Sequence, residues 1–413
     1  MTASTESGAP SRFAFHYIGF RFFWATTLLV SFGVQIMAVS IAWQIYDVTG
    51  NAFLLGLVGL SLFLPALLLI LVTGLTADRF SRRGIMLVCL LVELTCALGF
   101  LLFVNAEAHE VWPIFVILVA LGTARAFWNP AAQSLAPNLV PPEALSNAIT
   151  VNTSAWQFSS IAGPAVGGLL YGIAPTVAFG VAATLIAIAG FCVFMIPKPA
   201  QVRGQQATSL ETMFAGFRYI FSNKVVLGAI SLDMFAVLMG GAVALLPIYA
   251  KDILQAGPQE LGFLRAAPGI GAILMGLVLI RIPVRDHAGK ILFLFVGLFG
   301  AFTVLFGFST NAWLSIFALT LIGASDMVSV TIRETIMQLW TPEEVRGRVN
   351  AVNSVFIGAS NELGEFRAGS VAALVGPVPA VVIGGFGAIA VAGIWATIFP
   401  QLRNQRRLDE KRA

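Results

Sequence analysis

The sequence predicts an all-α membrane protein with 12 transmembrane helices, arranged as two pseudo-symmetric six-helix bundles with both termini in the cytoplasm. Three observations support this prediction. The chain is 58% hydrophobic and only 11% charged, its apolar runs match the length of bilayer-spanning helices, and its basic residues gather on one side of the predicted spans. Soluble proteins carry about 25% charged residues, so this composition does not fit a water-soluble domain.

The predicted spans are apolar runs bounded by polar, glycine or proline turns. An α-helix needs about 20 residues to cross the hydrocarbon core of a bilayer. In chain order the predicted spans cover residues 20–46, 52–75, 84–104, 112–134, 147–171, 175–196, 225–250, 261–280, 291–308, 312–339, 349–375 and 380–400.

The basic residues give the orientation of these spans. Almost all of the 24 lysines and arginines fall in loops and helix ends on one side, and the opposite loops carry only Lys251. Arg125, Arg265 and Arg367 fall inside spans. Lysine and arginine mark the cytoplasmic side, so the formal charge of +4 reflects topology, and we expect a lipid bilayer but no nucleic acid as a partner.

One long cytoplasmic loop divides the chain. We predict an N-terminal bundle over residues 1–196, a cytoplasmic linker over 197–223, a C-terminal bundle over 224–400 and a basic cytoplasmic tail over 401–413. Within the linker, residues 208–221 place apolar side chains on one helical face, which predicts an amphipathic helix at the membrane surface. A partly ordered linker is the alternative. The apolar face consists of Leu210, Met213, Phe214, Phe217 and Phe221.

The two bundles carry traces of an internal repeat. Gly122 recurs as Gly323, and Pro65 recurs as Pro268, at offsets of about 200 residues. Two such repeats in a transporter rock against each other around a central cavity. The repeat therefore predicts alternating exposure of a central site to the two sides of the membrane.

A charged motif joins the second and third spans. Its residues are Gly74, Asp78, Arg79, Arg82 and Arg83, and we expect them to form a short hinge. The spacing resembles the loop between spans two and three of the major facilitator superfamily. This resemblance implies the facilitator fold and a gating loop that closes the cytoplasmic side, with Asp78 facing the start of span eleven. The alternative is a loop that only sets topology.

A second motif lies in span five, where Gly163, Pro164, Gly167 and Gly168 form the pattern Gly-Pro-x-x-Gly-Gly. Glycines provide a flat face for close helix packing, and proline removes a backbone donor. The pattern resembles the signature of the exporting, proton-antiporting branch of the superfamily. It indicates a packing helix at the moving interface, and a packing face without directional meaning is the alternative.

Acidic residues inside the spans are candidates for proton coupling. A charge at mid-membrane costs at least about 2.5 kcal/mol, so each such residue must be paired, protonated or turned inward. The candidates are Asp326, Glu365, Glu362 and Asp233, of which we favour Asp326 and Glu365. We also expect Arg125, Asp233 and Asp326 to lie at similar depth. Static ion pairs are the alternative, and for Glu93 a structural role is preferred.

Aromatic and amide side chains are expected around a substrate cavity. Such a lining suits bulky amphiphilic molecules, whereas the alternative for each tryptophan is packing or anchoring at the membrane surface. The substrate-cavity candidates are Gln35, Arg125, Trp128, Asn129, Trp156, Gln157 and Arg265.

The sequence contains no motif of an enzyme or an ATP-driven pump. No Walker loop, dinucleotide fingerprint, nucleophile triad or metal-ligand spacing occurs, and the 3 histidines are dispersed. We therefore expect no catalytic residue, no cofactor and no metal, and we expect an ion gradient to drive transport.

Stretches at 43–50, 326–333, 342–349 and 360–366 narrow the resemblance to the branch that includes the enterobactin exporter and macrolide efflux proteins. This resemblance implies a multi-pass inner-membrane protein, expected as a monomer, that exports a small amphiphilic drug or siderophore by proton antiport. The alternatives are a metabolite importer or symporter, a non-transporting membrane sensor and a lipid flippase.

Overall fold

The structure is a computed structural model, and it describes residues 12–106, 110–197 and 210–407. These residues are almost entirely helical and contain no β-strand, which confirms the predicted fold class. Capping side chains begin several helices, because the first backbone N–H groups of a helix lack partners within it. Asn51 accepts a hydrogen bond from the Phe53 amide at 2.9 Å, and Asn311 accepts one from the Trp313 amide at 2.9 Å.

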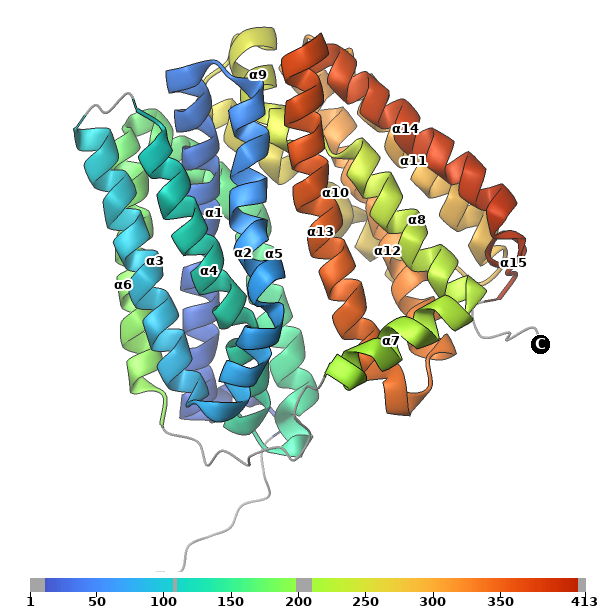
Figure 1. The fold of residues 1–413 in the computed structure, drawn as a ribbon, viewed down its shortest axis with the longest axis horizontal. Coiled ribbons are helices and arrows are strands. Elements are labelled where there is room, and N and C mark those ends of the chain that lie inside the picture. The colour runs from blue at the N-terminus through green and yellow to red at the C-terminus, as the bar shows by residue number, and fades with distance from the viewer. Residues whose placement is uncertain (1–11, 107–109, 198–209, 408–413) are drawn as a thin grey trace, which may run out of the picture.

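The first half of the chain forms six long helices, which lie side by side in Figure 1. Short 3-10 turns precede the first helix (η1, Ala14–His16) and follow the fourth (η2, Ala136–Leu139). The long helices are α1 (Ile18–Thr49), α2 (Ala52–Arg79), α3 (Arg82–Asn105), α4 (Trp112–Leu135), α5 (Pro142–Ile173) and α6 (Pro175–Met195).

The second half begins with a short helix that crosses the ends of its neighbours, α7 (Leu210–Ser222). The remaining elements are α8 (Lys224–Gly240), η3 (Val243–Leu245), α9 (Leu246–Ile248), η4 (Tyr249–Ile253), α10 (Pro258–Arg281), α11 (Ala288–Gly307), α12 (Ala312–Trp340), α13 (Glu343–Val375), α14 (Pro377–Ile398) and α15 (Pro400–Arg403).

Ten segments of the described residues are long and apolar enough to cross a membrane. The segment at 224–253 is one of them and combines α8 with the short helices that follow it. α5 and α13 are not among the ten, although they contain 32 and 33 residues. Each packs against a helix of the opposite half, α5 on α10 and α13 on α2, so their polar side chains can avoid lipid.

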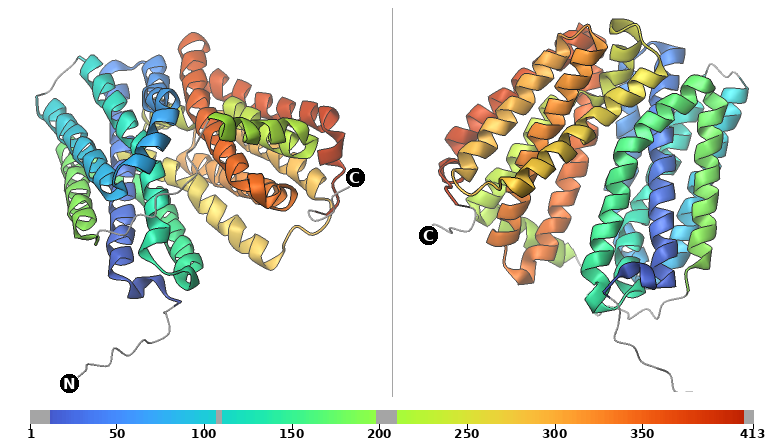
Figure 2. Two further views of the ribbon diagram at one scale, coloured as in Figure 1. Left: turned by 60° about the horizontal axis from the view of Figure 1, so that its bottom comes forward. Right: turned by 180° about the vertical axis from the view of Figure 1, so that it is seen from behind.

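The two halves meet at one end and separate toward the other (Figures 1 and 2). At the meeting end, Ile41 and Leu55 of the first half share one buried apolar cluster with Leu245 and Leu261 of the second half. The other end of the second half has its own cluster, which includes Ile336. At this end of the molecule lie the α2–α3 turn of the first half and α7 and the start of α13 of the second half. We call this end the basic face, and it is the predicted cytoplasmic side.

The charged motif at 74–83 differs from the expected hinge. Gly74 and Arg79 belong to the last turns of α2, whereas Arg82 and Arg83 begin α3, so that only residues 80 and 81 lie between the helices. The hydroxyl of Ser81 accepts a hydrogen bond from the Gly84 amide at 3.2 Å. Ser81 is therefore the N-cap of α3, and its hydrogen bond allows α3 to begin with only two residues between it and the end of α2.

The seventh predicted span is broken, not continuous. α8 ends at Gly240, and a 3-10 turn, a short α-helix and a π-helical turn carry the chain to Ile253. Gly240 and Gly241 lower helix propensity at the break. The break redirects residues 243–253 across the end of the molecule toward the first half, as Figure 1 shows near α9.

The amphipathic helix of the linker is present as α7, although Thr208 and the side chains of Leu210, Met213 and Phe214 lie outside the described residues. The ring of Phe217 packs edge-on against Phe356 of α13 at a centroid distance of 5.9 Å. Ile220 is fully buried, whereas Phe221 is exposed. The helix therefore rests on α13 through Phe217 and Ile220, and Phe221 points away from the protein.

Candidate functional site

The two halves touch along a pair of equivalent helix contacts, and the first joins α2 to α13. A Cβ atom at Gly59 of α2 would lie 2.8 Å from Glu362 Oε2 and 3.2 Å from Glu365 Oε2. Glycine at this position therefore lets the two helices approach with the acidic face of α13 turned toward α2. Glu362 and Glu365 thus share one face of α13.

The second contact joins α5 to α10. A Cβ atom at Gly262 would lie 2.6 Å from the Pro164 carbonyl oxygen, and one at Gly168 would lie 2.3 Å from the Pro258 carbonyl oxygen. The packing motif of span five also serves its own half, because Gly163 and Gly167 face Gln35 and Ile36 of α1. Pro164 and Gly168 of this motif therefore lie at the interface between the two bundles, whereas Gly163 and Gly167 lie inside the first bundle.

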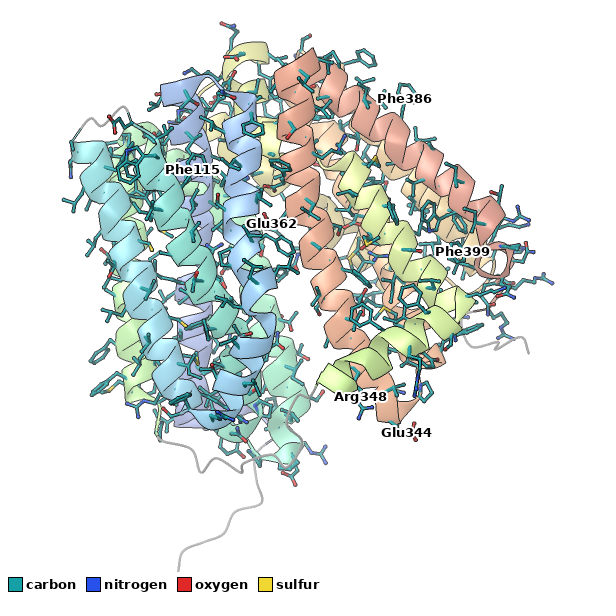
Figure 3. The ribbon with its side chains drawn as sticks, viewed as in Figure 1. Phe115, Glu344, Arg348, Glu362, Phe386 and Phe399 are labelled. Atoms are coloured by element: carbon teal, nitrogen blue, oxygen red, sulfur yellow. The ribbon has the colours of Figure 1, made fainter. Side chains whose placement is uncertain are left out.

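A cluster of five charges spans the interface, in which Glu93 is buried and the other four side chains are half-buried. Its acidic members are Glu362 and Glu365 of α13 and Glu93 of α3, and its basic members are Arg125 of α4 and Arg265 of α10. Arg125 interacts electrostatically with Glu93 and Glu362. Arg265 interacts with Glu365 and Glu362. Figure 3 shows Glu362 between the two bundles, so we call this group the interface cluster.

The interface cluster is incompletely paired in this conformation. Glu93 is 1% exposed, and its Oε2 atom has no hydrogen-bond partner; Nε of Arg125 has none either. Buried charges that lack hydrogen bonds are expensive, which makes such a group responsive to protonation or to rearrangement of its helices. Glu93 therefore belongs with the charges at the interface and is more than an isolated polar residue of α3.

A second cluster lies within the C-terminal half. Arg333 Nη1 of α12 forms an ion pair with Asp233 Oδ2 of α8 at 2.6 Å, and both side chains are buried. Asp326 lies about two helical turns from Arg333 on the same helix and interacts electrostatically with Asp233 and Arg333. We call Asp233, Asp326 and Arg333 the C-terminal cluster.

The sequence analysis counted Arg333 among the basic residues at cytoplasmic helix ends and did not predict its pairing with buried carboxylates. The spacing could have indicated this pairing, because residues 326 and 333 are seven apart and so share a helix face. Asp233 and Asp326 interact with each other, whereas the charged partners of Arg125 are Glu93 and Glu362. That Arg125, Asp233 and Asp326 lie at similar depth in the membrane stays a prediction.

Arg367 satisfies backbone groups at the break of the seventh span. Its side chain donates hydrogen bonds to the carbonyl oxygen of Leu238, at 2.9 Å, and to that of Met239. These carbonyls belong to the last turn of α8, where intrahelical partners run out. Arg367 therefore stabilises an irregular backbone within the bundle, through contacts from α13 to α8.

The substrate-cavity candidates are dispersed. Gln35 donates a weak hydrogen bond to the Ser160 carbonyl oxygen at 3.4 Å, and Trp128 packs against the apolar core of its half. Trp156 is 55% exposed. Asn129 is exposed and Gln157 is half-buried. Gln35 and Trp128 therefore have packing roles here, while the other three side chains are accessible.

The arginines of the charged motif bind helix ends in their own half. Arg82 donates to the Ser134 carbonyl oxygen at 2.8 Å, and Arg83 donates to the Phe194 carbonyl oxygen at 2.5 Å. Both carbonyls lie in the last turns of α4 and α6, where a cation is favoured by the unpaired C=O groups and the helix dipole. The side chain of Asp78 lies outside the described residues.

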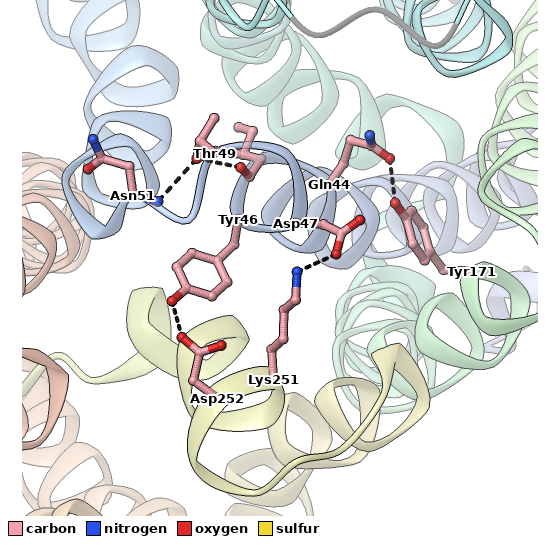
Figure 4. A network of polar contacts seen from close by, with 9 residues as sticks. Gln44, Tyr46, Asp47, Thr49, Asn51, Tyr171, Lys251 and Asp252 are labelled. Carbon is pink, nitrogen blue, oxygen red and sulfur yellow. Dashed lines mark hydrogen bonds and ion pairs between the residues drawn. The ribbon is translucent and has the colours of Figure 1, made fainter.

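Polar contacts join the halves at the end opposite the basic face (Figure 4). Lys251 forms an ion pair with Asp47 at 2.5 Å, and the hydroxyl of Tyr46 donates a hydrogen bond to Asp252. Asp47 and Tyr46 lie on α1, whereas Lys251 and Asp252 lie on η4. We call these two contacts the outer latch. The redirected end of the seventh span supplies Lys251 and Asp252 to it, and α1 supplies Asp47 and Tyr46.

An apolar pocket lies elsewhere, between α2, α3 and α4. It has a volume of about 720 Å³, and its lining includes Phe80, Val88, Cys89 and Phe127. The size suits a drug-sized molecule, but a specific site also needs a few directed polar groups. The described residues contain no group of three metal-ligating side chains.

The fold and the buried charges at the interface define a membrane transporter built from two bundles. The sequence profile of the transmembrane secretion effector family matches residues 10–412, and the chain belongs to this family of the major facilitator superfamily. Its relatives are transporters and not enzymes, and they place it among multi-pass proteins of the inner membrane.

Similar proteins support this assignment. The enterobactin exporter EntS of Shigella boydii serotype 4 (strain Sb227) is 28% identical over 400 residues, covering 92% of this chain and 91% of the exporter. EntS of Escherichia coli O127:H6 is 28% identical over 388 residues, covering 91% and 87%. Among solved structures, an inward-facing bacterial homologue of the lysosomal transporter Spinster has a TM-score of 0.72 at 15% identity, covering 94% of this chain and 96% of that one.

Proposed function

We propose that this protein is a proton-coupled antiporter that exports a small amphiphilic organic molecule, of the siderophore or drug class, by alternating access. The observation that carries the proposal is the composition of the interface cluster. Three carboxylates, Glu93, Glu362 and Glu365, interact electrostatically with two arginines, Arg125 and Arg265. The cluster therefore holds one more carboxylate than it has cations, and the excess carboxylate can exchange a proton.

The position of the cluster supports coupling to movement. Glu362 and Glu365 belong to the C-terminal half, whereas Arg125 and Glu93 belong to the N-terminal half. When the halves rock, the distances between these groups change, and a carboxylate that leaves an arginine gains affinity for a proton. Protonation on one side of the membrane and release on the other would then follow the same motion that moves the substrate.

The relatives support export as the direction. Both named relatives are enterobactin exporters, and the two halves here are joined at the end opposite the basic face. With the basic face in the cytoplasm, the bundles separate toward the side from which an exporter loads its substrate.

The test is proton flux in proteoliposomes. Purified protein is reconstituted with a pH-sensitive dye inside, a pH gradient is imposed, and enterobactin and cationic drugs are added in turn. We expect substrate-stimulated proton flux from wild type, a loss of at least about tenfold in E362Q/E365Q, and no loss in E344Q, a control on the exposed first turn of the same helix.

Three outcomes would overturn the proposal. Flux that survives in E362Q/E365Q would remove these glutamates from coupling. Substrate movement in the same direction as the proton would identify a symporter. A complete absence of gradient-dependent flux across the panel would favour a sensor.

A further inference from the structure

A small basic pocket lies on the basic face of the C-terminal half, far along the chain from both charge clusters. Its volume is about 270 Å³, and it lies between the start of α11 and the segment that follows α14. Four of its six lining residues have basic side chains, and no carboxylate of the described residues lines it. The lining is His287, Lys290, Arg403, Asn404, Gln405 and Arg406.

The pocket is held in shape by backbone contacts between two segments distant in sequence. The Ala288 amide donates to the Arg406 carbonyl oxygen at 3.2 Å, and the Gly289 amide donates to the Gln405 carbonyl oxygen at 3.0 Å. These amides belong to the first turn of α11, so the chain after α15 satisfies donors that the helix itself cannot. The four basic side chains are thus presented by an ordered backbone.

Close packing at Gly289 fixes the same arrangement. A Cβ atom at Gly289 would lie 1.9 Å from the Leu402 carbonyl oxygen, a distance that no side chain can tolerate. Leu402 is fully buried, and Gln405 is 2% exposed. The segment from 402 to 405 is therefore docked against α11, and its basic neighbours stand at the surface.

The three cations of the pocket, Lys290, Arg403 and Arg406, have no acidic partner in the part of the chain that the structure describes. The ion pairs found there are Lys251–Asp47, Arg333–Asp233 and Arg346–Glu343, and none involves this pocket. Three cations around one small pocket repel each other, and an anion that enters would relieve this repulsion, while the His287 ring can donate a hydrogen bond to it. The shape and charge therefore fit a compact group such as a phosphate.

The membrane supplies such a group at this level. α11 is one of the apolar membrane-crossing segments, so its first turn lies near the surface of the predicted cytoplasmic leaflet. Basic pockets at the cytoplasmic ends of transmembrane helices bind the headgroups of anionic lipids, because lipid phosphates are concentrated at this surface. We propose that His287, Lys290, Arg403 and Arg406 form a binding site for the phosphate of an anionic phospholipid.

The test is lipid binding by the full-length purified protein, measured by native mass spectrometry with phosphatidylglycerol and phosphatidylcholine. We expect retention of phosphatidylglycerol and a loss of about 30-fold in its affinity for K290Q/R403Q, since two surface cations are removed. The matched control is R281Q/R285Q, which removes two exposed arginines close in sequence to the pocket but outside its lining. This control should change the affinity by less than about threefold.

Each result decides for or against the site. Equal losses in the two double variants would show a diffuse basic surface and no pocket. Equal retention of phosphatidylcholine would show that the acyl chains bind, not the anionic headgroup. Displacement of phosphatidylglycerol by millimolar inorganic phosphate would identify a soluble anion as the occupant and overturn the lipid assignment. Because the readout is lipid binding, loss of transport would leave this inference untouched.

Discussion

Lys251 of η4 forms an ion pair with Asp47 of α1 at a distance of 2.5 Å, and the pair joins the two halves at the end opposite the basic face. Both side chains are partly exposed, at 38% and 49%. Exposed ion pairs contribute about 0–1 kcal/mol. The outer latch can therefore bias the equilibrium between conformations without locking the protein in one of them.

We expect D47N to raise the population of molecules with separated outer ends by up to about fivefold, as a loss of up to 1 kcal/mol predicts. Spin labels at the exposed positions Leu102 of α3 and Phe386 of α14 report this separation as a longer distance. The exchanged pair D47K/K251D should restore the wild-type distribution, whereas E110Q, in an exposed loop, should leave it unchanged. A failure of the exchanged pair to restore it would contradict the latch.

The buried pair of Arg333 and Asp233 should contribute to stability in an asymmetric way. Removing one partner leaves a buried charge without compensation, which costs about 3–5 kcal/mol, whereas replacing both by apolar residues is often neutral. We expect R333M to lower the free energy of unfolding by that amount and D233L/R333M to recover most of it, as measured by chemical unfolding in detergent. The exposed R285Q should change it by less than about 0.5 kcal/mol.

Asp326 should behave differently from Asp233, although both belong to the C-terminal cluster. Two carboxylates share one arginine there, and Arg333 makes its ion pair with Asp233. D326N removes the excess carboxylate and should leave stability unchanged or raise it. D233N removes the hydrogen-bonded partner and should lower stability by about 3 kcal/mol or more. Equal destabilisation by the two variants would contradict this division of roles.

Because Asp326 is also a favoured proton-coupling candidate, D326N should reduce the number of protons exchanged for each substrate molecule. The comparison is the ratio of proton flux to substrate flux in proteoliposomes, measured for wild type and D326N under the same gradient. An unchanged ratio would assign proton coupling to the interface cluster alone.

Glycine at position 59 should control how closely α2 approaches α13. In G59A the new methyl group would lie 2.8 Å from Glu362 Oε2, and overpacking of this kind costs about 1–3 kcal/mol. We expect a shift toward separated outer ends in the same spin-label measurement. G180A is the control, because a Cβ atom there would have no atom within 4 Å. Equal distance distributions in G59A and G180A would show that the close approach of α2 to α13 at Gly59 does not control the separation of the outer ends.

The helical fold could be predicted because its signals are local. Apolar runs, caps and charged ends are each read within one helix, so the positions of most spans agree with the structure. The break after Gly240 was harder to foresee, because residues 243–253 are as apolar as a continuous span. Their path depends on packing against the first half, where Leu245 and Leu246 are fully buried.

The sequence by itself determined most of the charges that enter the membrane, since a charged residue within an apolar run can be read directly; Arg333, near a predicted helix end, was missed. Only the tertiary structure decided how these charges pair. Arg333 and Asp233 are 100 positions apart, and their contact depends on the packing of α12 against α8. The interface cluster likewise draws on four helices from both halves. The physical reason is that helix formation depends on neighbouring residues, whereas the pairing of buried charges depends on how whole helices pack and rotate against one another.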